Sequence, residues 1–177
     1  MDKPVFKPLQ VLLALTGAMG LMLLGTSEGW AQQKAGTMQQ QLVGLWTAVF
    51  VFVSSPDGKK NQAFGSNPVG LLIFDAGGRY SMQICSSGRA KFTTNIRDKG
   101  TPEENQAAVK GCNPHWGKYT VDEEDHAIVF DIEHGMFPNW EGTRQKRSAT
   151  ITGDELRYVV PTASIGGTAE VVWRRAK

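Results

Sequence analysis

The chain is poor in the residues and motifs that usually mark a catalytic or metal centre. It has only two cysteines and three histidines in 177 residues, and no histidine pair has a recognised zinc-ligand spacing. No nucleophile, paired-carboxylate or phosphate-loop signature is present. We therefore expect no metal and no cofactor, and the sequence assigns no catalytic residue.

An excess of charge of one sign is also lacking. Nineteen basic residues against seventeen acidic ones leave a net charge of +2, and the basic residues are scattered along the chain. Proteins that bind nucleic acid usually carry a basic patch or stripe. The charge pattern therefore argues against nucleic acid as a partner.

Only one long apolar run is present, and it lies near the N-terminus. Lys3 and Lys7 precede an apolar stretch at 9–24, and Gly29 and Ala31 place small residues before a possible cleavage site. This layout is typical of a signal peptide over residues 1–31. An uncleaved membrane anchor is the alternative, because the run approaches the length that spans a bilayer. We expect cleavage after Ala31, a periplasmic or secreted protein, and no membrane span in the mature chain.

The mature chain is expected to consist of a flexible segment at 32–41 and one folded domain at 42–177. Its length suits a single hydrophobic core, and no internal repeat indicates a second domain. The sequence gives no indication of an oligomeric state.

Cys85 and Cys112 are the only cysteines, so within the chain they can pair only with each other. In an oxidising compartment this bond would persist, and closing the loop between them would stabilise the fold by about 3 kcal/mol. We expect the disulfide. Two free, partly buried thiols are the alternative.

Alternating apolar residues predict an almost entirely β structure. The longest strand is expected at 41–55, where Trp46, Ala48, Phe50 and Phe52 share one face and Leu45, Val49, Val51 and Val53 share the other. Further strands are expected at 67–75, 79–86, 115–122, 127–134, 143–152, 155–161 and 169–175. A helix is expected at 102–110, with too few apolar residues for the core, as a lid or plug at one end of the sheet.

About eight short antiparallel strands with one short helix fit an all-β, up-and-down barrel better than a parallel sheet. A barrel of this size is just wide enough for side chains or one small ligand. A two-sheet sandwich is the alternative.

Several short motifs occur in a characteristic order: LVGLW at 42–46, NPVGLLIF at 67–74, GGRYS at 77–81, GKYTVD at 117–122, FPNWEGT at 137–143 and VWRR at 172–175. Together they resemble the lipocalin-like domain family of small calycin-type barrels. The resemblance implies an apolar interior that often holds a hydrophobic small molecule, and it implies no agreed reaction. It also implies a structural role for Gly44 and Trp46, with Trp46 packed under Arg174 or Arg175 at the closed end.

Strand alternation predicts a polar cluster inside the barrel. His134 ends the apolar face of the strand at 127–134, and the corresponding faces of its neighbours carry His115, Tyr119, Gln145 and Arg147. If these faces point inward, the polar groups converge. Tyr80, Met82 and Trp140 would line the apolar part of the same site.

Arg147 would bind a carboxylate or other acidic head through a forked pair of hydrogen bonds. The alternative is that the polar groups satisfy one another in a filled barrel, because buried polar groups are normally paired.

The sequence therefore predicts an exported barrel that binds a small hydrophobic ligand, with or without an acidic head. One alternative is an isomerase or cyclase, with His134 or His115 as general base and Tyr119 or Arg147 stabilising developing charge. The other is a filled barrel that serves as an interaction module in the envelope.

Overall fold

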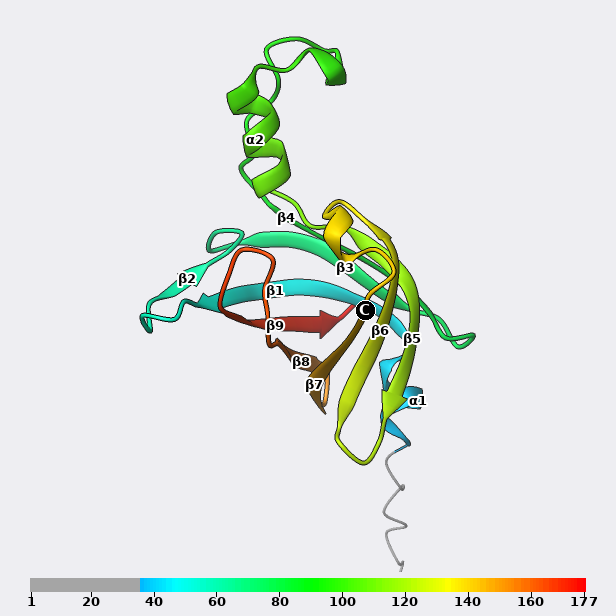
Figure 1. The fold of residues 1–177 in the computed structure, drawn as a ribbon. Coiled ribbons are helices and arrows are strands. Elements are labelled where there is room, and N and C mark those ends of the chain that lie inside the picture. Colours follow the sequence, from blue (N-terminus) through cyan, green and yellow to red (C-terminus); the bar gives the residue numbers. More distant parts are fainter. Residues whose placement is uncertain (1–35) are drawn as a thin grey trace, which may run out of the picture. The chain divides into compact units, whose positions relative to one another are not determined.

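The computed structural model describes residues 36–177, whose strands close into an antiparallel barrel (Figure 1). The strands are β1 (Gly44–Ser54), β2 (Lys60–Gln62), β3 (Pro68–Phe74), β4 (Arg79–Ser86), β5 (His115–Asp122), β6 (Ala127–Gly135), β7 (Arg144–Thr152), β8 (Glu155–Val160) and β9 (Thr168–Arg175). The predicted barrel of about eight strands is confirmed, with the three-residue β2 added to it. The expected signal peptide, or its alternative as an anchor, lies outside the described residues.

The barrel closes because β1 pairs on both of its sides. Residues 44–47 pair with β3, and residues 46–54 pair with β9. The last three residues of β1 also pair with β2, which takes the place of β3 there. The other neighbours follow chain order from β3 to β9. The pairing of the first and last strands excludes the two-sheet sandwich.

A β-bulge in β1 changes which of its side chains face inward. The pairing of β1 with β9 shifts between Ala48 and Phe50. Beyond the bulge, Val51 and Val53 are buried in the core. Phe50 and Phe52 pack against each other, and the guanidinium of Arg157 lies over the Phe50 ring. The expected division of this strand into two fixed faces is therefore wrong after Ala48, because an extra residue inverts the alternation.

One end of the barrel is closed by Trp46 and Arg175. Trp46 is fully buried, and its Nε1 donates to the carbonyl of Leu42 at 2.8 Å. The guanidinium carbon of Arg175 lies 4.1 Å from the Trp46 ring centre, and the same side chain donates to the carbonyls of Gln41 and Val43. Of the two arginines considered from the sequence, Arg175 is therefore the partner.

Gly44 turns the chain into β1 with a φ of 131°, a backbone conformation that favours glycine. A Cβ there would also lie 3.4 Å from Nη1 of Arg175. Arg174, by contrast, alternates to the exposed face of β9.

The end of the expected flexible segment is instead a short helix, α1 (Met38–Leu42). Thr37 and Gln40 form a capping box, and the backbone N–H groups of Met38 and Gln39 donate to the Glu123 carboxylate. Met38 and Leu42 are both buried. Because residues four apart share one helix face, this pair packs into the core. The glutamines between Met38 and Leu42 make this apolar spacing hard to recognise in the sequence.

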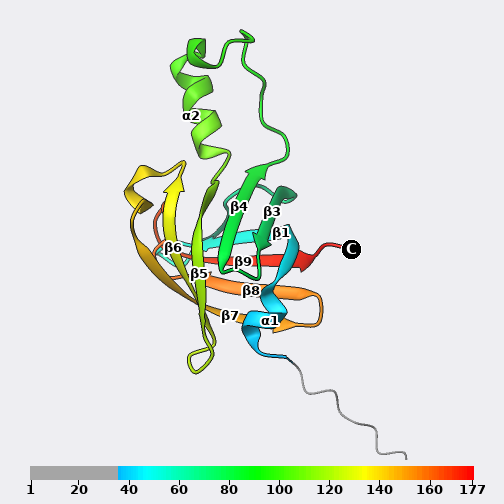
Figure 2. The same cartoon turned by 90° about the vertical axis from the view of Figure 1, so that its right-hand side faces the viewer.

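A second helix, α2 (Pro102–Lys110), lies in the long connection between β4 and β5 and has the predicted bounds. A capping box between Thr101 and Glu104 begins it. Most of it does not cover the barrel, because Figures 1 and 2 show it standing away from the strands and none of its residues is buried; only Val109 and Lys110 at its C-terminal end lie beside the barrel interior. The 3₁₀ turns η1 (Arg97–Lys99) and η2 (Pro138–Trp140) complete the helical segments.

The predicted disulfide between Cys85 and Cys112 is present. It joins the two ends of the β4–β5 connection, where the two residues also form an isolated β-bridge. The base of the connection is thereby held beside the barrel. Within residues 36–177, no helix combines the length and apolar content needed to cross a bilayer.

Candidate functional site

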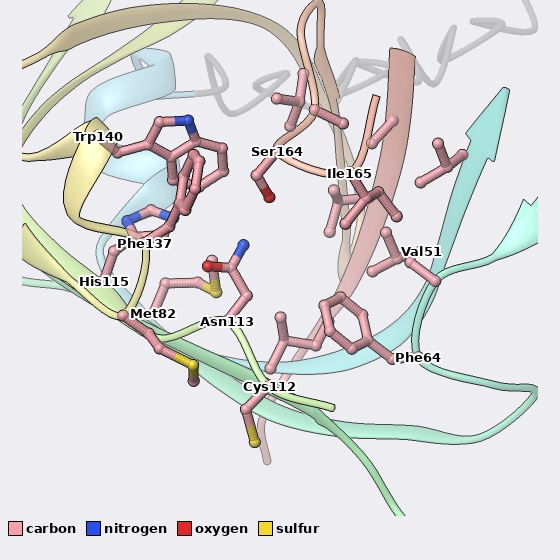
Figure 3. Close-up of a pocket in the computed structure, with 18 of the residues that line it drawn as sticks. Val51, Phe64, Met82, Cys112, Asn113, His115, Phe137, Trp140, Ser164 and Ile165 are labelled. Atoms are coloured by element: carbon pink, nitrogen blue, oxygen red, sulfur yellow. The ribbon is translucent and has the colours of Figure 1, made fainter. Parts of the chain in front are cut away.

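The barrel contains a largely apolar cavity of about 260 Å³. It lies at the end of the barrel away from Trp46, and the exposed residues Val109 and Ile165 are part of its lining, so it reaches the surface. Figure 3 shows Trp140 and His115 on one side of the cavity and Val51 and Phe64 on the other. The cavity is therefore an interior site that is open to solvent at one end.

Arg147 is the only charged residue that is buried among residues 36–177, and it lines the cavity. Its guanidinium carbon lies 4.5 Å from the ring centre of Phe130, 5.4 Å from that of Tyr158 and 5.8 Å from that of Trp140. Burial lowers the pKa of Arg147, yet a guanidinium stays protonated at neutral pH. The cavity thus holds a positive charge among aromatic rings.

No carboxylate of the described part of the chain lies within salt-bridge distance of Arg147. Buried charges are normally paired, because their removal from water is costly. Among residues 36–177, therefore, no carboxylate neutralises the charge on Arg147.

Gln145 orients Arg147 through a short chain of hydrogen bonds. Nη2 of Arg147 donates to Oε1 of Gln145 at 2.8 Å. The Gln145 amide donates to Oγ1 of Thr143 at 3.4 Å, and the Thr143 hydroxyl donates to the carbonyl of Trp140 at 2.6 Å. Gln145 lies on the inward face of β7 with Arg147, two residues along the strand, as the alternation predicts.

His115 is the second buried polar group of the cavity. Its Nδ1 lies 2.8 Å from the Tyr80 hydroxyl. Burial holds the pKa of His115 well below its usual range, and the charge of Arg147 acts in the same direction. Burial also raises the pKa of Tyr80. Both side chains are therefore neutral at physiological pH.

His134 lies on the outside of the barrel, so its predicted place in the interior row is wrong. Gly117 pairs with Ile132 whereas Trp116 pairs with His134, which leaves Glu133 as an extra residue in β6. This bulge turns His134 outward, where its ring centre lies 5.6 Å from that of Trp116.

The close approach at this bulge requires glycine, because a Cβ on Gly117 would lie 2.1 Å from the carbonyl oxygen of Asp131. A glycine inside a strand is a common mark of a bulge. Gly117 therefore marks an irregularity in the sequence, but it lies on the partner strand β5 and does not identify the extra residue in β6.

The other predicted ligand-binding residues fall into three groups. Met82, His115, Trp140 and Arg147 line the cavity. Tyr80 and Gln145 lie behind it, bonded to His115 and Arg147. Tyr119 is outside the lining, since its ring packs against Phe74 and its hydroxyl donates to the carbonyl of Asp75.

Tyr158 and Trp173 also line the cavity, although they were not predicted as site residues. Leu156, Tyr158 and Val160 alternate as buried residues of β8, and Ala169, Val171 and Trp173 do so in β9, where Val172 is buried as well. This alternation could have found them, because β8 pairs directly with the β7 strand that carries Arg147.

No group of three or more histidine, cysteine, aspartate or glutamate side chains in the described range is arranged to hold a metal ion. The polar side chains among the lining residues are those of Arg147, His115, Trp140, Trp173, Tyr158, Asn113, Ser164 and Lys110. These groups suit hydrogen bonding to an organic molecule.

The hollow barrel, the Trp46–Arg175 closure and the motif order define a lipocalin-like protein. The chain belongs to the lipocalin-like domain family, whose model matches residues 43–176. A relative, the 4'-hydroxy-3'-methoxypropiophenone carrier protein of Aspergillus oryzae, is 28% identical over 105 residues, which cover 54% of this chain and 95% of that protein.

Two solved structures are also similar. A lipocalin-like protein from Bacteroides uniformis has a TM-score of 0.42 and 12% identity, with 76% of this chain and 98% of that chain covered. A mutant of the fluorescent protein UnaG has a TM-score of 0.36 and 14% identity, with 78% and 99% covered.

Proposed function

We propose that the protein binds a small, largely apolar molecule in the barrel cavity and acts as its carrier. The observation that carries this proposal is the cavity itself, about 260 Å³ with a mainly apolar lining and one open end. A closed apolar core of a small barrel would ordinarily be filled by side chains. An interior that stays hollow and reaches solvent is typical of a ligand site.

The cavity volume sets the size of the molecule. An apolar cavity of about 150 Å³ in another protein is enough to bind benzene. The cavity described here therefore has room for one aromatic ring with a short substituent. The Aspergillus oryzae relative is named as a carrier of a single-ring aryl ketone, which supports a ligand of this size.

The alternatives are less well supported. A hollow interior counts against a filled barrel that only mediates contacts. The isomerase or cyclase alternative loses one of its two possible general bases, because His134 lies outside the barrel. Tyr119, one of the groups expected to stabilise charge, is also outside the lining. We therefore propose binding without turnover.

A cavity-filling variant tests this proposal. Three probes of equal size are titrated calorimetrically: 3-phenylpropanoate, 3-phenylpropanamide and 4-phenyl-2-butanone. Replacement of the cavity residue Val171 by Phe should weaken binding at least about tenfold, because the added ring occupies the site. Val159 on the adjacent strand is exposed, so Val159→Phe is the matched control. The proposal fails if no probe binds saturably, or if the two variants bind alike.

We also propose that the protein is exported. The charged start, apolar run and small residues over 1–31 support this proposal, and so does the disulfide, because such bonds persist in oxidising compartments. N-terminal sequencing of protein from its own cells should begin at Gln32. Protein that begins at Met1 in the membrane fraction would instead support the anchor.

A further inference from the structure

We propose that the polar end of the bound molecule is a carboxylate, held as the anion by Arg147 with His115 and Trp173 as further hydrogen-bond donors. This inference rests on the proposed function, because it names the chemical class of the molecule that occupies the same cavity.

Three buried nitrogen atoms of residues that line the cavity have no hydrogen-bond partner of good geometry among the described residues, although the Tyr158 hydroxyl lies near Trp173 and Arg147. They are Nε2 of His115, Nε of Arg147 and Nε1 of Trp173. Guanidinium and indole nitrogens can only donate. Because buried polar groups in native proteins are nearly always paired, these atoms indicate a ligand that accepts hydrogen bonds.

Tyr80 determines which nitrogen of His115 carries the proton. The Tyr80 hydroxyl makes its one hydrogen bond to Nδ1 of the neutral imidazole. If Nδ1 were the donor, the buried hydroxyl hydrogen would have no acceptor, which is unfavourable. The hydroxyl therefore donates to Nδ1, and the imidazole proton lies on Nε2. His115 then joins Arg147 and Trp173 as a donor.

His115 and Arg147 act on the same part of the cavity, because they flank the same two rings. The His115 ring centre lies 6.3 Å from that of Phe130 and 5.6 Å from that of Trp140. The Arg147 guanidinium carbon lies 4.5 Å and 5.8 Å from these two rings. In the proposed complex, one planar acceptor group lies between the two side chains and accepts from both.

A carboxylate matches this set of groups better than an amide or a ketone. It brings two acceptor oxygens and the negative charge that Arg147 lacks. A primary amide would direct two N–H hydrogens at donors, and a ketone offers one weaker acceptor and no charge.

No group of the described residues that faces the guanidinium changes its charge near neutral pH. These groups are His115, Tyr80 and Tyr158, and burial lowers the pKa of His115 and raises the pKa of the two tyrosines. Asp131 and Glu133, the nearest acidic residues on β6, pair instead with Arg144 and Arg79. Since no group of residues 36–177 supplies the missing negative charge at pH 7, we assign it to the ligand.

The three matched probes separate this inference from the proposed function. Wild-type protein should bind 3-phenylpropanoate at least about tenfold more tightly than the amide or the ketone, since a hydrogen bond to a charged group contributes more than a neutral one. Equal binding of all three would overturn the carboxylate assignment and leave the proposed function standing. Binding of none would overturn both.

Proton uptake in wild-type protein gives a test that depends on no variant. Calorimetry at pH 7 in two buffers of different ionisation enthalpy should show no proton taken up with 3-phenylpropanoate, because the anion binds as it is. Uptake of one proton per bound acid would mean that the neutral acid binds, and would overturn the inference.

Substitutions then assign the donors. Arg147→Met should abolish the preference for the carboxylate while binding of the ketone is retained, which also shows that the variant is folded. Arg157 lies outside the barrel in ion pairs with Glu155 and Glu170, so Arg157→Met should keep the preference. His115→Phe and Trp173→Phe should each reduce it in part. An unchanged preference in Arg147→Met would refute the assignment.

Discussion

The Arg175 guanidinium lies over the Trp46 ring, with 4.1 Å between the guanidinium carbon and the ring centre. This contact joins the last strand to the first and is supported by hydrogen bonds from Arg175 to two carbonyls that precede β1. A cation over an indole ring contributes about 0.5–2 kcal/mol, depending on how far it is desolvated. The contact between Trp46 and Arg175 therefore stabilises the closed end of the barrel.

Replacement of Arg175 by Ala should lower the free energy of unfolding by about 2 kcal/mol, since both the ring contact and the hydrogen bonds are lost. Urea denaturation measures the change. Arg174→Ala is the control. The Arg174 side chain is exposed, and a substitution at an exposed position changes stability by about 0.5 kcal/mol or less. Equal losses in the two variants would contradict the assignment of Arg175.

Loss of the disulfide should destabilise the protein. Replacing Cys85 and Cys112 together by Ser should lower the free energy of unfolding by about 3 kcal/mol, because the unfolded chain regains the freedom of the closed loop. Denaturation with and without reductant should give the same difference in wild-type protein. If reductant has no effect on the wild type although it breaks the bond, the predicted contribution is wrong.

Gly117→Ala should destabilise the protein by about 2 kcal/mol, since a Cβ there meets the Asp131 carbonyl and overpacking of this kind costs about 1–3 kcal/mol. The clash lies at backbone atoms, so a side-chain rotation cannot relieve it. Gly88→Ala is the control, because nothing lies within 4 Å of its Cβ position. Thermal unfolding of both variants compares them directly. A Gly117→Ala protein as stable as wild type would argue against the bulge.

The stability of the protein should depend on His115 at mildly acidic pH. The folded pKa of His115 is lowered by burial, so the unfolded state binds a proton more readily than the folded state. The contribution of His115 to the free energy of unfolding is therefore complete above the ordinary histidine pKa of about 6.5. It falls as the pH drops below this value, by up to about 1.4 kcal/mol per pH unit.

His115→Phe should remove this part of the pH dependence between about pH 7 and pH 5, the range that begins above the ordinary histidine pKa. His134→Phe is the control, because the His134 side chain is exposed. Urea denaturation at several pH values measures both slopes. If the two variants show the same slope, His115 is not the group responsible.

Much of the fold could be predicted because local rules and tertiary structure agree. The alternation in 79–86 matches the buried Tyr80, Met82 and Ile84 of β4. Thr101 and Pro102 mark the start of α2, where capping and a fixed φ favour a helix, and Gly111 follows its end. Such signals depend on neighbouring residues alone.

The bulges in β1 and β6 could not be placed from alternation, because an extra residue is recognised only from the partner strand. Each bulge inverted the faces that follow it, which moved Phe50 and His134 outward. Arg147 and Gln145 were placed correctly because β7 keeps a regular alternation. Whether the barrel is hollow depends on how side chains from all strands fill the interior, which residue types alone do not determine.

The pairing of β1 with β9 has a consequence for biosynthesis. Of the strands that form the barrel, β9 is the last to leave the ribosome. Until then β1 and β8 each expose an edge that can pair with another chain. Contacts between distant parts of a chain also form slowly. The nascent protein is therefore most prone to aggregation just before β9 is made, and a premature stop ahead of this strand should yield an insoluble product.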